Sequence, residues 1–113
     1  MSSMASPFEI ASAQALSLTG LVNYQDGSVV SRVILKRDSG NITLFAFDEG
    51  QGLSEHTTPY DAMVQVIEGE AEITIAGDAS AVSAGEIILL PAKQPHAVKA
   101  TTRFKMMLTM IRG

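Results

Sequence analysis

Short runs of alternating apolar and polar residues recur along this chain, and they predict strands rather than helices. Residues 28–37, SVVSRVILKR, are rich in β-branched residues, which favour a strand. Residues 38–41, DSGN, form a turn signal, and residues 42–47, ITLFAF, follow as a second strand, so the pair predicts a hairpin. Further strands are predicted at residues 62–67, 71–76, 80–83, 87–90, 96–100 and 104–111.

This succession of short strands and turns, with almost no helical periodicity, indicates an all-β fold. An antiparallel sandwich or barrel is the arrangement that closes such strands around one core. Because side chains alternate between the two faces of a strand, one set of residues is expected inside. That interior set is Ala62, Val64, Val66, Ile73 and Ile75, with Phe45 or Phe47 and members of the group 106–110. Gln65 falls on the opposite face, where we expect a partner strand or subunit.

The last predicted strand, residues 104–111, is apolar on both faces and therefore needs cover on both. The barrel interior covers one face, and either a second subunit or the N-terminal segment covers the other. Residues 5–20 form either a short helix over residues 12–16, with Ser12 as its N-cap, or an apolar arm. We therefore expect a homodimer, formed by sheet-to-sheet packing or by exchange of the arm.

The composition narrows the range of partners and compartments. The 113 residues predict a single domain, residues 1–113, in which residues 1–6 are polar and small and are expected to be disordered. There is no cysteine, so disulfides and thiolate chemistry are excluded. The net charge of −4 without a basic run argues against a nucleic-acid partner. With no long apolar run and no leader pattern, we expect no membrane partner and a cytoplasmic location.

Each histidine lies in a stretch that begins with glycine: His56 in residues 50–69 and His96 in residues 85–100. In the first, Gly50, His56 and Gly69 stand at set distances from one another. In the second, the corresponding positions are Gly85, Pro91 and His96. At these positions the chain resembles the cupin superfamily of small proteins similar to RmlC, and the resemblance covers roughly residues 28–111. The resemblance implies an antiparallel jelly-roll barrel, here with a short N-terminal arm or helix.

The chain departs from the cupin motifs at positions that matter for function. The resemblance implies three histidines and one carboxylate around a divalent metal inside the barrel. Thr58 stands where the second histidine is expected, and Ala62 stands where the glutamate is expected. Asp61 is one place off and would point to the opposite face unless the segment bulges. Lys93 replaces a motif glycine and Ala100 an asparagine.

The two retained histidines leave several kinds of site open. Two imidazoles are too few for a closed metal site, but His56 and His96 with waters would bind nickel, zinc, copper or iron weakly. They are also consistent with pocket histidines bonded to backbone or to each other, or with a general base. Our first interpretation is a small-molecule-binding cupin of unassigned activity. Its ligand-binding residues are predicted to be His56, Thr58, Tyr60, Ala62, Val64, His96 and Met106.

Two alternatives remain beside that first interpretation. One is a metal-dependent enzyme of the dioxygenase or isomerase type that acts on a small organic substrate. The other is a non-catalytic scaffold or sensor. An open pocket with a polar mouth favours binding, whereas a barrel filled by side chains favours a scaffold.

Overall fold

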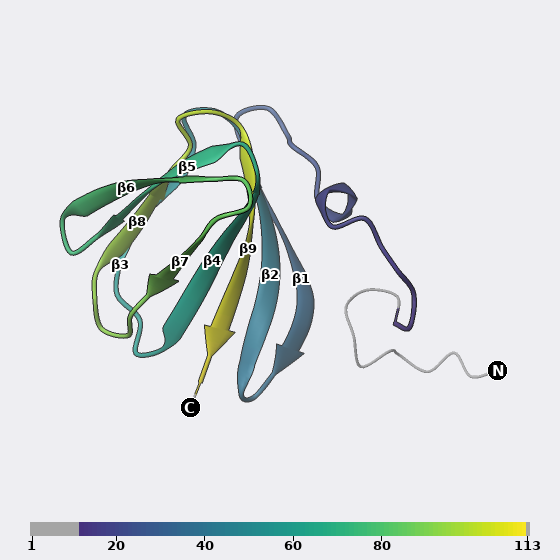
Figure 1. The fold of residues 1–113 in the computed structure, drawn as a ribbon, viewed down its shortest axis with the longest axis horizontal. Coiled ribbons are helices and arrows are strands. Elements are labelled where there is room, and N and C mark those ends of the chain that lie inside the picture. Colours follow the sequence, from purple (N-terminus) through teal and green to yellow (C-terminus); the bar gives the residue numbers. More distant parts are fainter. Residues whose placement is uncertain (1–11, 113) are drawn as a thin grey trace.

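The computed structural model describes residues 12–112, in which one short 3₁₀ turn precedes nine strands (Figure 1). The turn, η1, spans Thr19–Leu21. The strands are β1 (Val29–Arg37), β2 (Gly40–Phe47), β3 (Gly52–His56), β4 (Asp61–Glu68), β5 (Glu70–Ile75), β6 (Asp78–Ser83), β7 (Ile87–Leu90), β8 (His96–Lys99) and β9 (Phe104–Ile111). No helix in this part of the chain is long and apolar enough to cross a membrane.

The strands form two antiparallel sheets that face each other. One sheet has the order β1-β2-β9-β4-β7, and the other has the order β3-β8-β5-β6. In Figure 1 the five-stranded sheet runs from β7 on the left to β1 on the right, with the N-terminal arm beyond β1. The predicted all-β jelly-roll barrel with an N-terminal arm is therefore confirmed.

The core between the sheets consists of the residues that alternation predicts to point inward. The fully buried members include Val64, Val66, Ile73, Phe47 and Met106. The rings of Phe47 and Phe104 stack with their centroids 4.5 Å apart. Burial of this apolar surface is the main stabilising contribution to the fold.

Glycine is required at the turn between β4 and β5. Gly69 has φ +76°, a left-handed conformation that other residues adopt only with strain. A Cβ atom at this position would lie 2.3 Å from the carbonyl oxygen of Arg103 and 2.9 Å from Cβ of Phe104. Gly69 thus lets β4 turn tightly against the start of β9.

The N-terminal segment is an arm, and the alternative of a helix over residues 12–16 is wrong. Residues 12–17 are all exposed, and Ala13 has φ +56°, which is outside the helical range. A helix this short has no packing face to stabilise it. Further along, Val22 is buried with Leu44 and Ala46 on the outer face of the five-stranded sheet. The predicted disorder of residues 1–6 concerns residues outside the described part.

Candidate functional site

Two paired strands bring the histidines into contact. His56 is the last residue of β3, His96 is the first residue of β8, and the two are directly paired across the ladder. Their Nε2 atoms lie 3.1 Å apart, and the ring centroids lie 4.3 Å apart at an angle of 68°. The structure therefore forms one compact imidazole pair from residues that are far apart in the sequence.

A β-bulge aims His56 into the barrel. Leu53 pairs with Val98 and packs against the core, so this pair marks the inward face of the two strands. From there the chain takes three steps along β3 to His56 but only two steps along β8 to His96. In a regular strand a residue three positions after Leu53 would face outward. The extra residue restores the inward direction, as bulges near functional sites commonly do.

Backbone carbonyls determine which nitrogen of each ring carries the proton. His56 Nδ1 lies 2.8 Å from the Ser54 carbonyl oxygen, and His96 Nδ1 lies 3.3 Å from the Gln94 carbonyl oxygen. A carbonyl oxygen only accepts, so each Nδ1 is the donor. In a neutral imidazole the Nε2 atom is then an unprotonated acceptor. Two unprotonated Nε2 atoms 3.1 Å apart repel each other, so this separation favours a proton shared by the pair, a donor group or a metal ion.

The two rings differ in their exposure to water. His96 is only 7% exposed, whereas His56 is exposed at the end of its strand. Burial lowers the pKa of His96, the bond to the Gln94 carbonyl opposes this effect, and the neighbouring His56 lowers the pKa further. His96 is therefore a neutral acceptor at neutral pH, and His56 forms the accessible side of the pair.

Apolar residues flank the pair on its own sheet, since Leu53 and Val98 form a ladder pair nearby. Ile75 is the ladder partner of His96 on the side away from His56. In the described part of the chain, seven residues pack against the core while remaining partly exposed: Val29, Phe45, Leu53, Ala62, Ile75, Ile88 and Leu108. Of the predicted ligand-binding residues, Ala62 belongs to this set. Val64 and Met106 are at most 1% exposed and lie within the core.

Thr58 and Tyr60 shape the loop beside the pair. The Thr58 hydroxyl donates to the Tyr60 carbonyl at 3.1 Å and accepts from the Tyr60 backbone N–H at 3.4 Å. The Thr58 carbonyl accepts from the Lys93 backbone N–H at 2.7 Å, which ties two loops together. The Tyr60 ring lies under the Arg112 guanidinium, 5.1 Å from its centroid. The structure thus gives both residues partners other than the histidines.

No third protein ligand of a usual type joins the pair. Within residues 12–112 there is no group of three or more His, Asp or Glu side chains that could hold a metal ion. The carboxylate of Asp61 accepts from the Ala92 backbone N–H at 2.8 Å. The carboxylate of Asp48 accepts from the Gly27 backbone N–H and from Arg103. The carboxylates of Asp61 and Asp48 are therefore engaged elsewhere.

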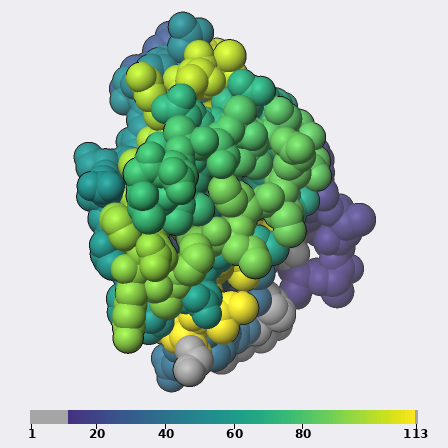
Figure 2. All heavy atoms as spheres, turned by 60° about the vertical axis from the view of Figure 1, so that its left-hand side comes forward, coloured from purple at the N-terminus to yellow at the C-terminus, as the bar shows by residue number. Residues whose placement is uncertain are grey.

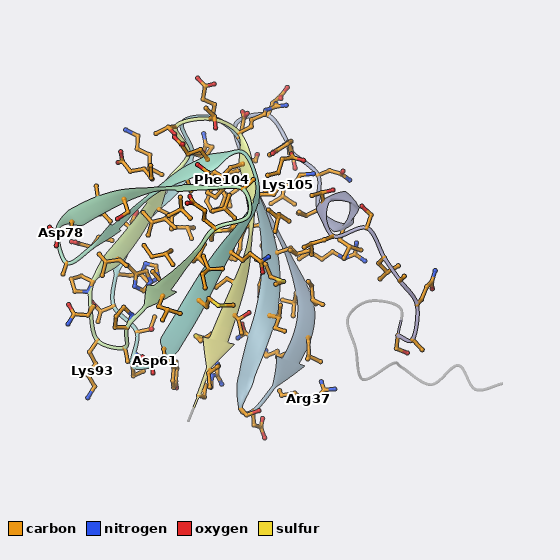
Figure 3. The ribbon with its side chains drawn as sticks, viewed as in Figure 1. Arg37, Asp61, Asp78, Lys93, Phe104 and Lys105 are labelled. Carbon is orange, nitrogen blue, oxygen red and sulfur yellow. The ribbon has the colours of Figure 1, made fainter. Side chains whose placement is uncertain are left out.

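Lys93 keeps the backbone conformation of the glycine that it replaces in the motif. Its φ is +69°, in the left-handed region. In Figure 3 its side chain points away from the barrel at the tip of the loop before β8. Lys93 thus joins its loop to Thr58 through its backbone N–H, while its ammonium group lies away from the barrel.

Sequence reasoning missed the residues that orient the histidines. Ser54 and Gln94 act through backbone carbonyls, which no residue type signals. The strand that carries His56 was also missed, because the sequence GLSEH has a single large apolar residue. Leu53 was the available signal for this strand, because an apolar residue between polar neighbours is typical of the inward position of a short strand.

Comparisons with known proteins agree with this geometry. Residues 43–112 match the family model of the cupin domain. A conserved protein of unknown function from Streptococcus pyogenes is 36% identical, with a TM-score of 0.91 over 99% of this chain and 98% of that chain. A cupin superfamily protein from Desulfitobacterium hafniense is 26% identical, with a TM-score of 0.89 over 96% of this chain and 100% of that one. Among curated proteins no match is found.

Proposed function

We propose that this chain, which belongs to the cupin family, binds a small molecule at the end of its barrel that holds His56 and His96, with these two residues as the polar anchor. The observation that carries the proposal is the close approach of two Nε2 atoms, 3.1 Å apart, on strands whose neighbouring inward residues, Leu53 and Ile75, are apolar. A small number of oriented polar groups in an apolar surrounding is the usual composition of a ligand site.

The geometry favours a ligand of a definite kind. The lone pairs on the two Nε2 atoms accept hydrogen bonds, so the ligand presents a hydroxyl, a carboxylic acid or another donor to them. Leu53, Ile75 and Leu108 offer apolar contacts to the remainder of the ligand. We therefore propose a small, partly apolar molecule with one protic polar end.

A second candidate uses the same two nitrogens to hold a divalent transition-metal ion. The observation in its favour is that both Nδ1 atoms face carbonyl oxygens, which leaves a lone pair on each of two Nε2 atoms that lie 3.1 Å apart. Such second-shell bonds are usual for metal-binding histidines. Neutral imidazole suits nickel, zinc, copper and iron. Two protein ligands fit a weakly held ion, which would act as a Lewis acid toward oxygen atoms of the ligand.

The experiment uses protein purified without a metal-affinity tag, together with His56→Ala, His96→Ala and the control Lys93→Ala. Metal content is measured by mass spectrometry. Binding of a library of small hydroxy and carboxylic compounds is followed by NMR, with a chelator and with added zinc. Binding that both histidine variants lose and Lys93→Ala keeps supports the site. Dependence on zinc identifies the metal form. If the library compounds and the metals bind equally to the native protein and to the histidine variants, the proposed site is wrong and the scaffold interpretation remains.

A further inference from the structure

Strand β1 leaves one edge of the five-stranded sheet unpaired. It stands at the end of the strand order, and at nine residues it is the longest of the four outer strands in the described part of the chain. Its pairing with β2 is regular from Val29 to Val33, and a register shift follows between Val33 and Leu35. The first half of β1 therefore presents an even edge, to which an extended peptide can add as a further strand.

The register shows which backbone groups of this edge point away from β2. The Asp48 N–H donates to the Ser28 carbonyl oxygen at 3.1 Å, in the same register as the first pairs of β1 with β2. Because such bonds recur at every second residue of an antiparallel ladder, the N–H and C=O groups of Val29, Ser31 and Val33 point outward. Within residues 12–112, no backbone hydrogen bond joins these outward groups to another segment. They are therefore open to an added chain.

A groove runs beside this edge. It has a volume of about 470 Å³ and is lined by residues 21–25 of the arm and residues 30–32 of β1. This volume lies within the range of ligand sites, roughly 300–1,000 Å³. The arm stands clear of the barrel in Figure 2, where it is purple, and its residues 21–25 bound the groove without filling it. Arg32 fixes this wall, because its Nη1 atom donates to the Leu21 carbonyl oxygen at 3.0 Å.

The two faces of β1 beside the groove differ in chemistry. Val29 packs against the inner core and Val30 against the cluster under the arm, so alternation places Val33 on the inner face and Arg32 on the outer face. Val33 is 38% exposed, which is unusual for a large apolar side chain of this protein. Arg32 is exposed as well. A strand added to β1 would thus meet an apolar side chain on one face and a cation on the other.

The charge of this edge is opposite to that of the whole chain. Residues 27–37 contain three basic residues and no acidic one, and residues 12–25 are uncharged, whereas the net charge of the chain is −4. Of the nearest acidic residues along the chain, Asp26 is paired with Arg103 at 2.6 Å, and Asp38 lies in the turn after β1. A basic edge of this kind is complementary to an acidic partner.

We propose that the outer edge of β1 binds an extended acidic peptide segment of another protein as an added strand. The outward backbone groups of Val29, Ser31 and Val33 form the ladder, in which main-chain bonds supply affinity and side chains supply specificity. Arg32 selects acidic side chains on the outer face, and Val33 contacts apolar side chains on the inner face. The segment therefore alternates acidic and apolar residues over the length of residues 29–33. This site is separate from the histidine pair, which lies on the other sheet.

The probe is a capped peptide of about seven residues in which glutamate alternates with valine, titrated into isotope-labelled protein and followed by NMR. Binding is expected with a dissociation constant below about 1 mM and with shifts centred on residues 21–25 and 29–33. Lysine in place of each glutamate is expected to weaken binding at least about tenfold. Methylation of every backbone amide of the peptide removes the ladder donors and is expected to abolish binding. A parent peptide that does not bind, or a methylated one that binds equally well, would overturn the proposal.

Two variants of the protein test the edge itself. Ser31→Pro removes an outward N–H but keeps the bonds of Val30 and Arg32 to β2, and proline is tolerated at such edge positions. Arg32→Glu reverses the charge without changing the backbone, so it keeps the test informative if Ser31→Pro perturbs folding. Each is expected to weaken binding of the parent peptide at least about tenfold, whereas the matched control Lys99→Glu, at an exposed position of β8, keeps it. Native affinity in either folded variant would contradict the proposal.

Discussion

The ammonium group of Lys105 donates to the carbonyl oxygen of Thr19 at 2.7 Å, so a buried side chain of β9 fastens the arm to the sheet. Lys105 is 7% exposed, and its Nζ atom lies 4.9 Å from the centroid of the Tyr24 ring. The Tyr24 hydroxyl in turn donates to Glu68 at 2.5 Å. Burial and this bond raise the pKa of Tyr24, which keeps its hydroxyl protonated as a donor. The arm is thus held by polar contacts as well as by apolar packing.

Replacing Lys105 with methionine is expected to loosen the arm. The substitution keeps most of the apolar stem but leaves the Thr19 carbonyl without its donor and Glu68 without its nearby charge. Loss of a charged donor of this kind costs about 1–3 kcal/mol of stability. Urea unfolding measures the cost, and hydrogen exchange of residues 18–24 measures the loosening. Lys99→Met, at an exposed position, is the control. Unchanged exchange in Lys105→Met would refute the role given to this contact.

Two glycine-to-alanine substitutions separate backbone strain from steric clash. Gly85 has φ +91° with open space around its Cα, so Gly85→Ala is expected to cost only the strain, about 1–2 kcal/mol. Gly69→Ala adds the contact with the Arg103 carbonyl and is expected to cost about 2–5 kcal/mol. Thermal or urea unfolding compares the two variants. Equal losses would show that the close approach at Gly69 relaxes without cost.

Stability in the presence of a chelator is expected to fall as the pH is lowered past the pKa of His96. Burial lowers the pKa of this group in the folded state below the value of about 6.5 in the unfolded chain. The unfolded chain therefore binds more protons, and the free energy of unfolding decreases with falling pH. The loss begins near pH 6.5 and is complete once the pH is below the folded pKa.

Urea unfolding across this pH range for native protein and His96→Gln provides the measurement. Glutamine keeps a polar side chain at the position but does not titrate, so His96→Gln is expected to show a flatter pH dependence. The same slope in both proteins would assign the effect to other groups.

Lys93→Gly is expected to stabilise the fold slightly. Lysine at φ +69° pays a backbone cost of about 1–2 kcal/mol that glycine avoids, and glycine offsets part of this gain through its greater freedom in the unfolded chain. The net gain is up to about 1 kcal/mol in urea unfolding. Since the lysine side chain points away from the barrel, ligand or metal binding at the histidines is expected to stay unchanged. Loss of binding would show that the Lys93 charge belongs to the site.

Much of the fold was predictable because it depends on local alternation. Strands such as β2, β4 and β9 carry enough apolar residues on alternate positions to be recognised one by one. By contrast, β3 has little alternation of its own, and its strand conformation depends on backbone pairing with β8. The arm was left undecided between two forms for the same reason, since packing on Leu44 and Ala46 determines its path.

The candidate site was predictable only as far as its residue types. The motif spacing predicted that His56 and His96 lie together, and their Nε2 atoms are 3.1 Å apart. The inward direction of His56 depends on a bulge, and the protonated nitrogens depend on the Ser54 and Gln94 carbonyls. These are properties of backbone register, which side-chain identity does not report. The same limit applies to Thr58, whose hydroxyl is bonded to the backbone of Tyr60.

The bulge that directs His56 also has a consequence for aggregation. β3 is an outer strand of its sheet, so one row of its backbone groups is free to recruit a foreign strand. An irregular strand is a poor template, because the extra residue breaks the even spacing that a continuous ladder requires. We therefore expect the extra residue that orients the histidine also to disfavour edge-to-edge association of the sheet. A chain engineered to a regular β3 would lose both properties together.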